Sequence, residues 1–252
     1  MSKHKNGFSF ENSLFFGLKE EMTEEQKRYV NALLDPNVKL VTVNAKAGTG
    51  KTTLAVAAAK ILIDTKKYQD LLYVFAPVEE DQMGFTPGDL FEKESKYHGP
   101  LLDALIAIGE KPERCIYSPT KEAAIKEAEK LKRSAEKKEH AKKESVELPN
   151  KYWVTPLSHT FLRGRNLINR VVIIDEAQNF TVSQLRKILT RCHDNCKVIL
   201  IGHTGQCDIE DHLSGFAPYI AHSRHLESAR QLELTKSFRG EIAEWADHIT
   251  DF

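Results

Sequence analysis

One octapeptide constrains the fold of this chain more than any other segment. Residues 45–52 read AKAGTGKT, after the apolar run 38–43 and before the helix-forming run 54–59. A glycine-rich turn between a strand and a helix, ending in Lys-Thr, is typical of a phosphate-binding loop, where backbone N–H groups and a helix N-terminus hold phosphate oxygens. The segment therefore predicts a nucleoside triphosphate site within an α/β domain.

The residues of this loop have separate predicted tasks. Lys51 would neutralise the β- and γ-phosphate charge, and the Thr52 hydroxyl would bind Mg²⁺. Ala45 stands at the first glycine of the usual motif, where a required positive φ would cost alanine about 1 kcal/mol or more. The predicted nucleotide ligands are Gln26, Ala47, Gly48, Thr49, Gly50, Lys51, Thr52 and Thr53.

Gln26 carries two alternative predictions. Thr23-Glu24-Glu25-Gln26 has the pattern of a capping box, in which the Gln26 amide accepts from the backbone at the start of a helix. The same amide, upstream of the first strand, could read the edge of adenine. Both alternatives stay open, and different atoms of the amide could serve each.

Composition narrows the class of protein. The 252 residues are 41% hydrophobic, which excludes a disordered or fibrous chain. Lys+Arg and Asp+Glu are both 36, so a polyanion could bind only at a local patch. No apolar run approaches about 18 residues and no secretory signal is evident, so we expect a soluble cytoplasmic protein without membrane contact. The four cysteines then read as reduced thiols, and their spacing disfavours a zinc site.

The remaining pattern predicts a three-layer α/β P-loop domain with a mostly parallel central sheet. The apolar runs 171–174 and 198–201 are continuous rather than alternating, as in strands buried on both faces. The predicted helices are 52–64, 182–192 and one beginning after Thr23, and the predicted strands are 38–43, 71–76, 152–155, 171–175 and 197–202.

The predicted organisation is an N-terminal tail, 1–22, and one domain, 23–252. A charged helical insertion lies at about 110–150, and its stretch 120–145 is dominated by Lys, Glu and Ala. Such a stretch is either a solvated face or a contact for a polyanion.

Two adjacent carboxylates, Asp175 and Glu176, stand at the end of the predicted strand 171–175. At the carboxyl edge of a parallel sheet they would lie beside the phosphate loop, with Asp175 holding Mg²⁺ and Glu176 orienting and deprotonating the attacking water. The alternative is that they only cap the following segment. Gln206, after the strand 197–202, is a candidate for contact with the γ-phosphate and water, and Arg239 for stabilising transition-state charge in this subunit or a neighbour.

With these pieces in place, the chain resembles the PhoH family of P-loop ATPases, whose fold is similar to the first RecA-like domain of superfamily 1 helicases. The resemblance runs from about Thr23 to Ile249. Beyond the phosphate loop it is carried by the segments 83–90, 100–105, 161–167, 175–179 and 189–191. It implies binding and hydrolysis of ATP with Mg²⁺. The chain departs from the family pattern at Ala45, Ala76 and His203, and its 110–150 region is longer.

The resemblance also implies contact with RNA or single-stranded DNA, through Ser158, His159, Thr160, Arg163 and Arg165. The alternative for both arginines is intramolecular pairing. Since the chain has one such domain, motion along a strand would need a second subunit. The expectation is therefore a homo-oligomer, with a hexameric ring as one arrangement, and with Arg239 or Arg191 reaching across the interface.

Three functions remain at this point. The first is a Mg²⁺-dependent ATPase acting on RNA or single-stranded DNA, with helicase-like activity included. The second is a nucleotide-gated binding protein with little turnover, in which the changes at Ala45, Ala76 and His203 have weakened hydrolysis. The third is a P-loop phosphotransferase, which Glu176 beside Asp175 disfavours because the pair suits water as the acceptor.

Overall fold

The computed structural model describes residues 22–76, 99–117, 152–162, 164–242 and 245. Several predictions fall outside this part of the chain: the tail, the segment 83–90, the charged stretch 120–145 and Arg163.

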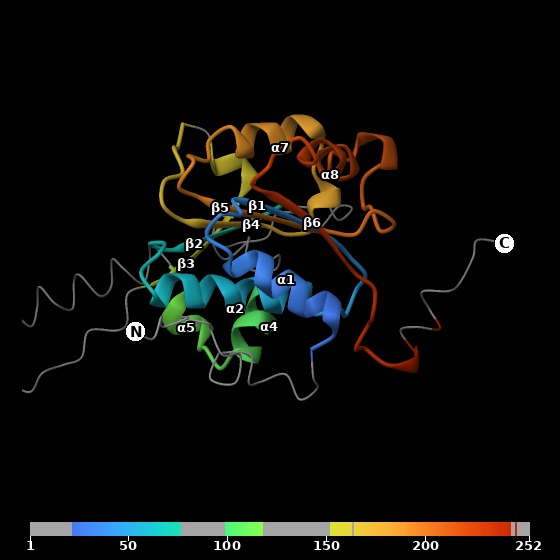
Figure 1. The fold of residues 1–252 in the computed structure, drawn as a ribbon, viewed down its shortest axis with the longest axis horizontal. Helices are drawn as coiled ribbons and strands as arrows, with labels where there is room; N and C mark the ends of the chain where they lie inside the picture. The colour runs from blue at the N-terminus through green and yellow to red at the C-terminus, as the bar shows by residue number, and fades with distance from the viewer. Residues whose placement is uncertain (1–21, 77–98, 118–151, 163, 243–244, 246–252) are drawn as a thin grey trace, which may run out of the picture.

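The described residues form a three-layer α/β domain around a six-stranded sheet in the order β3-β2-β4-β5-β1-β6 (Figure 1). Every strand pairing is parallel, so the predicted fold class is confirmed. The strands are β1 Leu40–Ala45, β2 Leu71–Phe75, β3 Val154–Ser158, β4 Val171–Ile174, β5 Lys197–Gly202 and β6 Ala229–Leu234.

Helices cover both faces of the sheet (Figure 1). One face carries α1 Glu24–Leu34, α2 Lys51–Asp64, α4 Gly99–Ala107 and α5 Pro112–Cys115. The other carries α7 Val182–Leu189 and α8 Phe216–Ser223, and the short 3-10 helices η4 His159–Leu162, η5 Ala177–Asn179 and η6 Asp211–Leu213 lie in the connections. None of the helices in these described ranges is long and apolar enough to cross a membrane.

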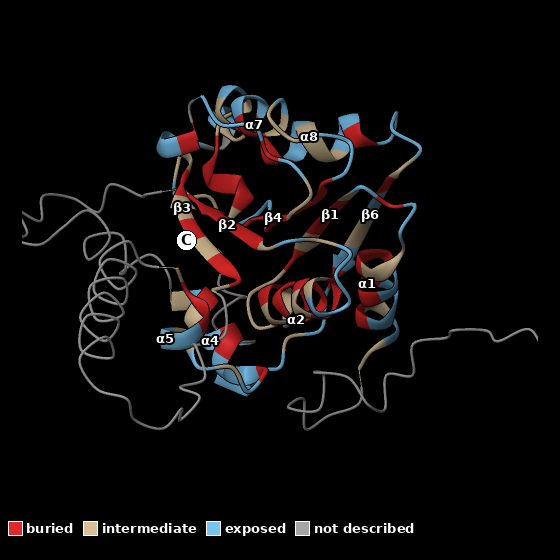
Figure 2. Cartoon of the chain, turned by 90° about the vertical axis from the view of Figure 1, so that its left-hand side faces the viewer, coloured by how far each residue is buried: buried red, intermediate tan, exposed pale blue. Residues whose placement is uncertain are grey.

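The continuous apolar strands are explained by a core on each face of the sheet (Figure 2). In β4, Val171 and Ile173 pack with α1 and α2, while Val172 and Ile174 pack with residues of α7 and α8. Because successive strand side chains point to opposite faces, a strand between two helix layers needs apolar residues at every position.

The structure corrects several predicted boundaries. The first strand runs from Leu40 to Ala45 rather than over 38–43, the third from Val154 to Ser158 rather than over 152–155, and the helix predicted as 182–192 ends at Leu189. The elements α4, α8 and β6 were not predicted, and α5 lies within the 110–150 range that was predicted as a helical insertion. At the beginning of the 110–150 range, Cys115 and Ile116 are buried in the core, and Ile116 bridges to Val154 at the edge of the sheet.

The concern over strain at Ala45 does not hold. Ala45 is the last residue of β1, is 1% exposed, and pairs in register with Leu234 of β6. It is not among the residues with positive φ. The turn that needs left-handed backbone begins later, at Gly48, so alanine at position 45 costs nothing conformationally.

Candidate nucleotide site

The phosphate loop joins β1 to α2 through two left-handed glycines. Gly48 has φ 76° and Gly50 has φ 79°, a conformation that other residues adopt at a cost. Gly50 is the N-cap of α2, and no side chain caps the N–H groups of the first turn. Those N–H groups therefore form an anion site at the positive end of the helix dipole, and Thr53 lies in the same turn.

Neighbouring segments hold the loop in shape. The Gln26 amide nitrogen donates to the Thr49 carbonyl at 3.0 Å, while its oxygen accepts from the Thr23 backbone at 3.0 Å. The Phe238 N–H donates to the Gly48 carbonyl at 2.9 Å. The capping-box alternative for Gln26 is thus confirmed, with an added contact to the loop. One amide hydrogen and one oxygen lone pair remain for a base.

Two residues that could hold Mg²⁺ lie in direct contact. The Thr52 hydroxyl donates to Asp175 Oδ2 at 2.8 Å, and Asp175 is 1% exposed. The contact spans β5, which lies between β1 and β4 and ends in Gly202. A hydroxyl and a carboxylate oxygen are hard ligands suited to Mg²⁺, so the residues present fit this ion.

Tyr73 completes this cluster, and the sequence analysis missed it. Its hydroxyl donates to Asp175 Oδ2 at 2.6 Å from the middle of β2. Burial and the Asp175 charge hold the pKa of Tyr73 well above its ordinary value, so the phenol stays protonated and donates. Burial and the nearby Glu176 charge raise the pKa of Asp175, opposed by the Tyr73 and Thr52 hydrogen bonds and by Lys51. A bound cation would offset the cost of burying this carboxylate.

Glu176 faces the loop lysine. Its Oε1 lies 3.4 Å from Lys51 Nζ, and its side chain is 42% exposed against 11% for the lysine. Glu176 has φ 49°, a left-handed conformation that turns the chain sharply after the strand. The adjacent acids therefore differ in environment. Asp175 is buried against Thr52 and Tyr73, whereas Glu176 is open to water beside the group expected to bind the γ-phosphate.

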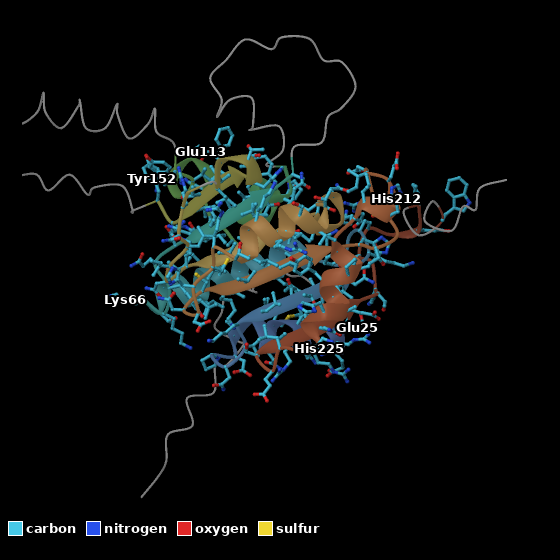
Figure 3. The ribbon with its side chains drawn as sticks, turned by 90° about the horizontal axis from the view of Figure 1, so that it is seen from above. Glu25, Lys66, Glu113, Tyr152, His212 and His225 are labelled. Atoms are coloured by element: carbon cyan, nitrogen blue, oxygen red, sulfur yellow. The ribbon has the colours of Figure 1, made fainter. Side chains whose placement is uncertain are left out.

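Arg239 lies against the phosphate loop of its own chain. A Cβ placed on Gly48 would meet Arg239 Cγ at 2.5 Å and Ser237 Oγ at 2.8 Å. Glu25, labelled in Figure 3, anchors the same segment by accepting from the Thr235 backbone at 2.8 Å and its hydroxyl at 2.9 Å. The aliphatic part of the Arg239 side chain thus lies beside the phosphate loop of its own chain.

Gln206 lies in the loop after β5, at the same edge of the sheet, and its side chain is exposed. His203, at the start of this loop, donates its backbone N–H to Gln178 Oε1 at 3.0 Å. Gln178 in turn donates to Glu176 Oε2 at 2.7 Å. The sequence analysis assigned no role to Gln178.

The candidate nucleic-acid residues separate into two groups. Ser158 is 2% exposed and bonds the Thr160 hydroxyl at 3.1 Å. His159 lies 3.2 Å from Gln184 of α7, its ring packs edge-on against Phe180, and burial lowers its pKa. These contacts favour internal support for both residues. Arg165 is exposed, so its side chain is open to a ligand.

The comparisons with known proteins decide the family. The model of the PhoH-like protein family matches residues 20–250. The chain belongs to the PhoH-like family. It is 34% identical over 188 residues to a PhoH-like protein of Mycobacterium tuberculosis (strain ATCC 25618 / H37Rv), covering 74% of this chain and 44% of the relative. It is 31% identical over 189 residues to Protein PhoH of Escherichia coli (strain K12), with the same coverage.

A longer match is found with Protein PhoH2 of Bacillus subtilis (strain 168), 26% identical over 243 residues, or 94% of this chain and 48% of the relative. This PhoH-like chain thus spans less than half the length of these relatives. Among solved structures, Pif1 helicase from Candida albicans is similar with a TM-score of 0.41 at 18% identity, covering 90% of this chain and 43% of that one. A Bacteroides sp Pif1 in complex with ADP-AlF4 gives 0.37 at 17%, covering 90% and 45%.

Proposed function

We propose that this PhoH-like protein hydrolyses ATP with Mg²⁺. The observation that carries the proposal is the difference in environment between the two adjacent acids. Asp175 accepts a hydrogen bond from Thr52 in a buried cluster, while Glu176 is exposed to water beside Lys51. A bound Mg²⁺ would supply positive charge to the phosphates. The protein groups that would hold it are Thr52 and Asp175.

The residues then act in the following way. The α2 N-terminus and the loop N–H groups bind the phosphates, and Lys51 exchanges its contact with Glu176 for phosphate oxygens. Glu176, released from the lysine, accepts a proton from the attacking water. Arg239, whose side-chain carbons lie against Gly48, would supply positive charge to stabilise the transition state.

We also propose that nucleic acid and a second copy take part. The support is the exposed side chain of Arg165, whose backbone carbonyl accepts from Arg191 just after α7, and the single P-loop motif in the given sequence. Replacing Arg165 by Ala should weaken binding of single-stranded RNA or DNA and make it less sensitive to salt. The control is Arg224→Ala, another exposed arginine, at the C-terminal end of α8. Equal binding by both variants would exclude Arg165 from the contact.

The test of the ATPase is steady-state phosphate release with ATP and Mg²⁺, with and without single-stranded RNA or DNA, beside a Lys51→Ala control. Release above the control establishes the activity, and stimulation by one polymer identifies the class of nucleic acid. Binding of nucleotide without release would favour the alternative of a nucleotide-gated binding protein. Scattering mass with and without an ATP analogue tests assembly, and a monomer in both conditions would contradict the homo-oligomer.

A further inference from the structure

The loop after β5, residues 203–208, is hydrogen-bonded at both ends to side chains that lie two and three residues after Glu176 in sequence. At its first residue, the His203 N–H donates to Gln178 Oε1 at 3.0 Å. At its last residue, the Asp208 N–H donates to Asn179 Oδ1 at 2.9 Å, and Asn179 Nδ2 donates to Asp208 Oδ2 at 2.5 Å. Two consecutive amides thus hold the two ends of one loop.

The chemistry of the partners fixes the orientation of both amides. A backbone N–H can only donate and a carboxylate can only accept, so each amide must present its oxygen to the loop backbone and its nitrogen to a carboxylate. For Gln178 that carboxylate is Glu176, at 2.7 Å. Gln178 is 2% exposed and Asn179 is 6% exposed, so water competes little for these hydrogen bonds.

The Gln178 side chain packs where Gly202 has no side chain. A Cβ on Gly202, the last residue of β5, would lie 2.7 Å from Gln178 Oε1 and 2.8 Å from the Phe216 ring. Beyond the loop, the Gly215 N–H donates to the Phe180 carbonyl at 2.7 Å, which continues the attachment of the two segments. The loop 203–208 and the segment 176–180 are therefore joined by specific hydrogen bonds and by close packing.

We propose that Gln178 and Asn179 are positioning residues that set the loop 203–208, and with it Gln206, relative to Glu176. This rests on the proposed ATPase. Gln178 bonds Glu176 itself, so the carboxylate that accepts the proton from water and the start of the loop share one amide. Gln206 stands between the two tethered residues, so a change in either tether moves it.

Variants of Asn179 test the proposal with a built-in rescue. Asn179→Leu removes both hydrogen bonds to Asp208, and Asn179→Asp sets a carboxylate against that of Asp208. The double variant N179D/D208N restores a donor and an acceptor. We expect kcat to fall about 10- to 100-fold in the two single variants, as for a displacement of about 1 Å, with KM for ATP within about twofold. The double variant should return kcat to within about threefold of the wild-type value.

A control variant at Asn195 and a Gln206→Ala background distinguish a positioning role of Asn179 from a general loss of folded structure. Asn195 also accepts from a backbone N–H, that of Asn169, at 3.1 Å, in an exposed turn before β5. Asn195→Leu should leave kcat within about twofold. In a Gln206→Ala background, Asn179→Leu should lower kcat by less than about threefold. The reason is that the hydrogen bonds of Asn179 affect kcat by positioning Gln206, which this background has already removed. An undiminished loss in this background, or no rescue by the double variant, overturns the proposal.

Hydrogen exchange keeps the proposal testable without turnover. In the wild-type chain the Asp208 amide should be protected, and Asn179→Leu should raise its exchange at least about tenfold while amides in β1 keep their rates. If the wild-type chain releases no phosphate but this pattern is found, the ATPase has failed and the tether stands as a structural device. If the exchange rates do not change, the tether itself is wrong.

Discussion

Gly48 gives the sharpest stability prediction because it has a matched partner in the same loop. Gly48 and Gly50 have φ of 76° and 79°, so alanine at either position costs about 1–2 kcal/mol of backbone strain. They differ in surroundings. A Cβ at Gly50 meets the Gln26 amide nitrogen at 3.5 Å, an ordinary contact, whereas at Gly48 it overlaps Arg239 Cγ at 2.5 Å. Displacing Arg239 adds about 1 kcal/mol at least.

We therefore expect Gly48→Ala to cost about 2–3 kcal/mol and Gly50→Ala about 1–2 kcal/mol. The assay is urea unfolding without nucleotide, followed by circular dichroism. In an Arg239→Ala background the cost of Gly48→Ala should fall by about 1 kcal/mol, whereas that of Gly50→Ala should not change. A coupling below about 0.3 kcal/mol between positions 48 and 239 would refute the placement of Arg239 on the loop of its own chain.

Two further predictions concern buried polar groups. Tyr73→Phe removes the donor 2.6 Å from Asp175 and should lower the free energy of unfolding by about 1.5–3 kcal/mol in urea, while an unchanged midpoint would contradict that hydrogen bond. Lys197, buried at the start of β5, donates to the Asp35 carbonyl at 2.7 Å, and burial lowers its pKa from 10.5 to about 8. Between pH 8 and 10.5 the Lys197 side chain stays protonated in the unfolded chain but loses its proton in the folded chain. The free energy of unfolding of the wild-type chain, minus that of Lys197→Met, should therefore rise with pH, by at most about 1.4 kcal/mol per pH unit. A flat or falling difference in urea midpoint across that range would show that the lysine is not buried as described.

The sequence predicts well those strands that have a continuous apolar run. The strand 197–202 was predicted with its observed bounds because its apolar run is continuous and Gly202 ends it. The strand β6 was missed because it lies at the edge of the sheet, and its sequence ARQLEL mixes exposed and buried residues. Edge strands are half solvated, so they lack the apolar run of a central strand.

The candidate site divides in a similar way. Lys51, Thr52, Asp175 and Glu176 were predicted because the loop motif and the strand end bring their positions together. Tyr73 was missed, although a tyrosine in the buried run LLYVF signals a hydroxyl that needs a partner. The contact of Arg239 with Gly48 spans 191 positions of sequence, and no local pattern predicts such a pair. The roles of Gln178 and Asn179 could not be predicted, because their hydrogen-bond partners lie in the loop 203–208, more than 20 residues away in sequence.

The central claim is that Glu176 accepts the proton from the attacking water while Lys51 and the loop bind phosphate. The most direct measurement is a single-turnover assay of Glu176→Gln with ATP and Mg²⁺, beside a binding measurement on the same variant. We predict that cleavage falls about 10²- to 10⁴-fold while ATP binds as tightly as in the wild-type chain or more tightly, because Lys51 loses its competing partner. Cleavage near the wild-type rate would contradict the account.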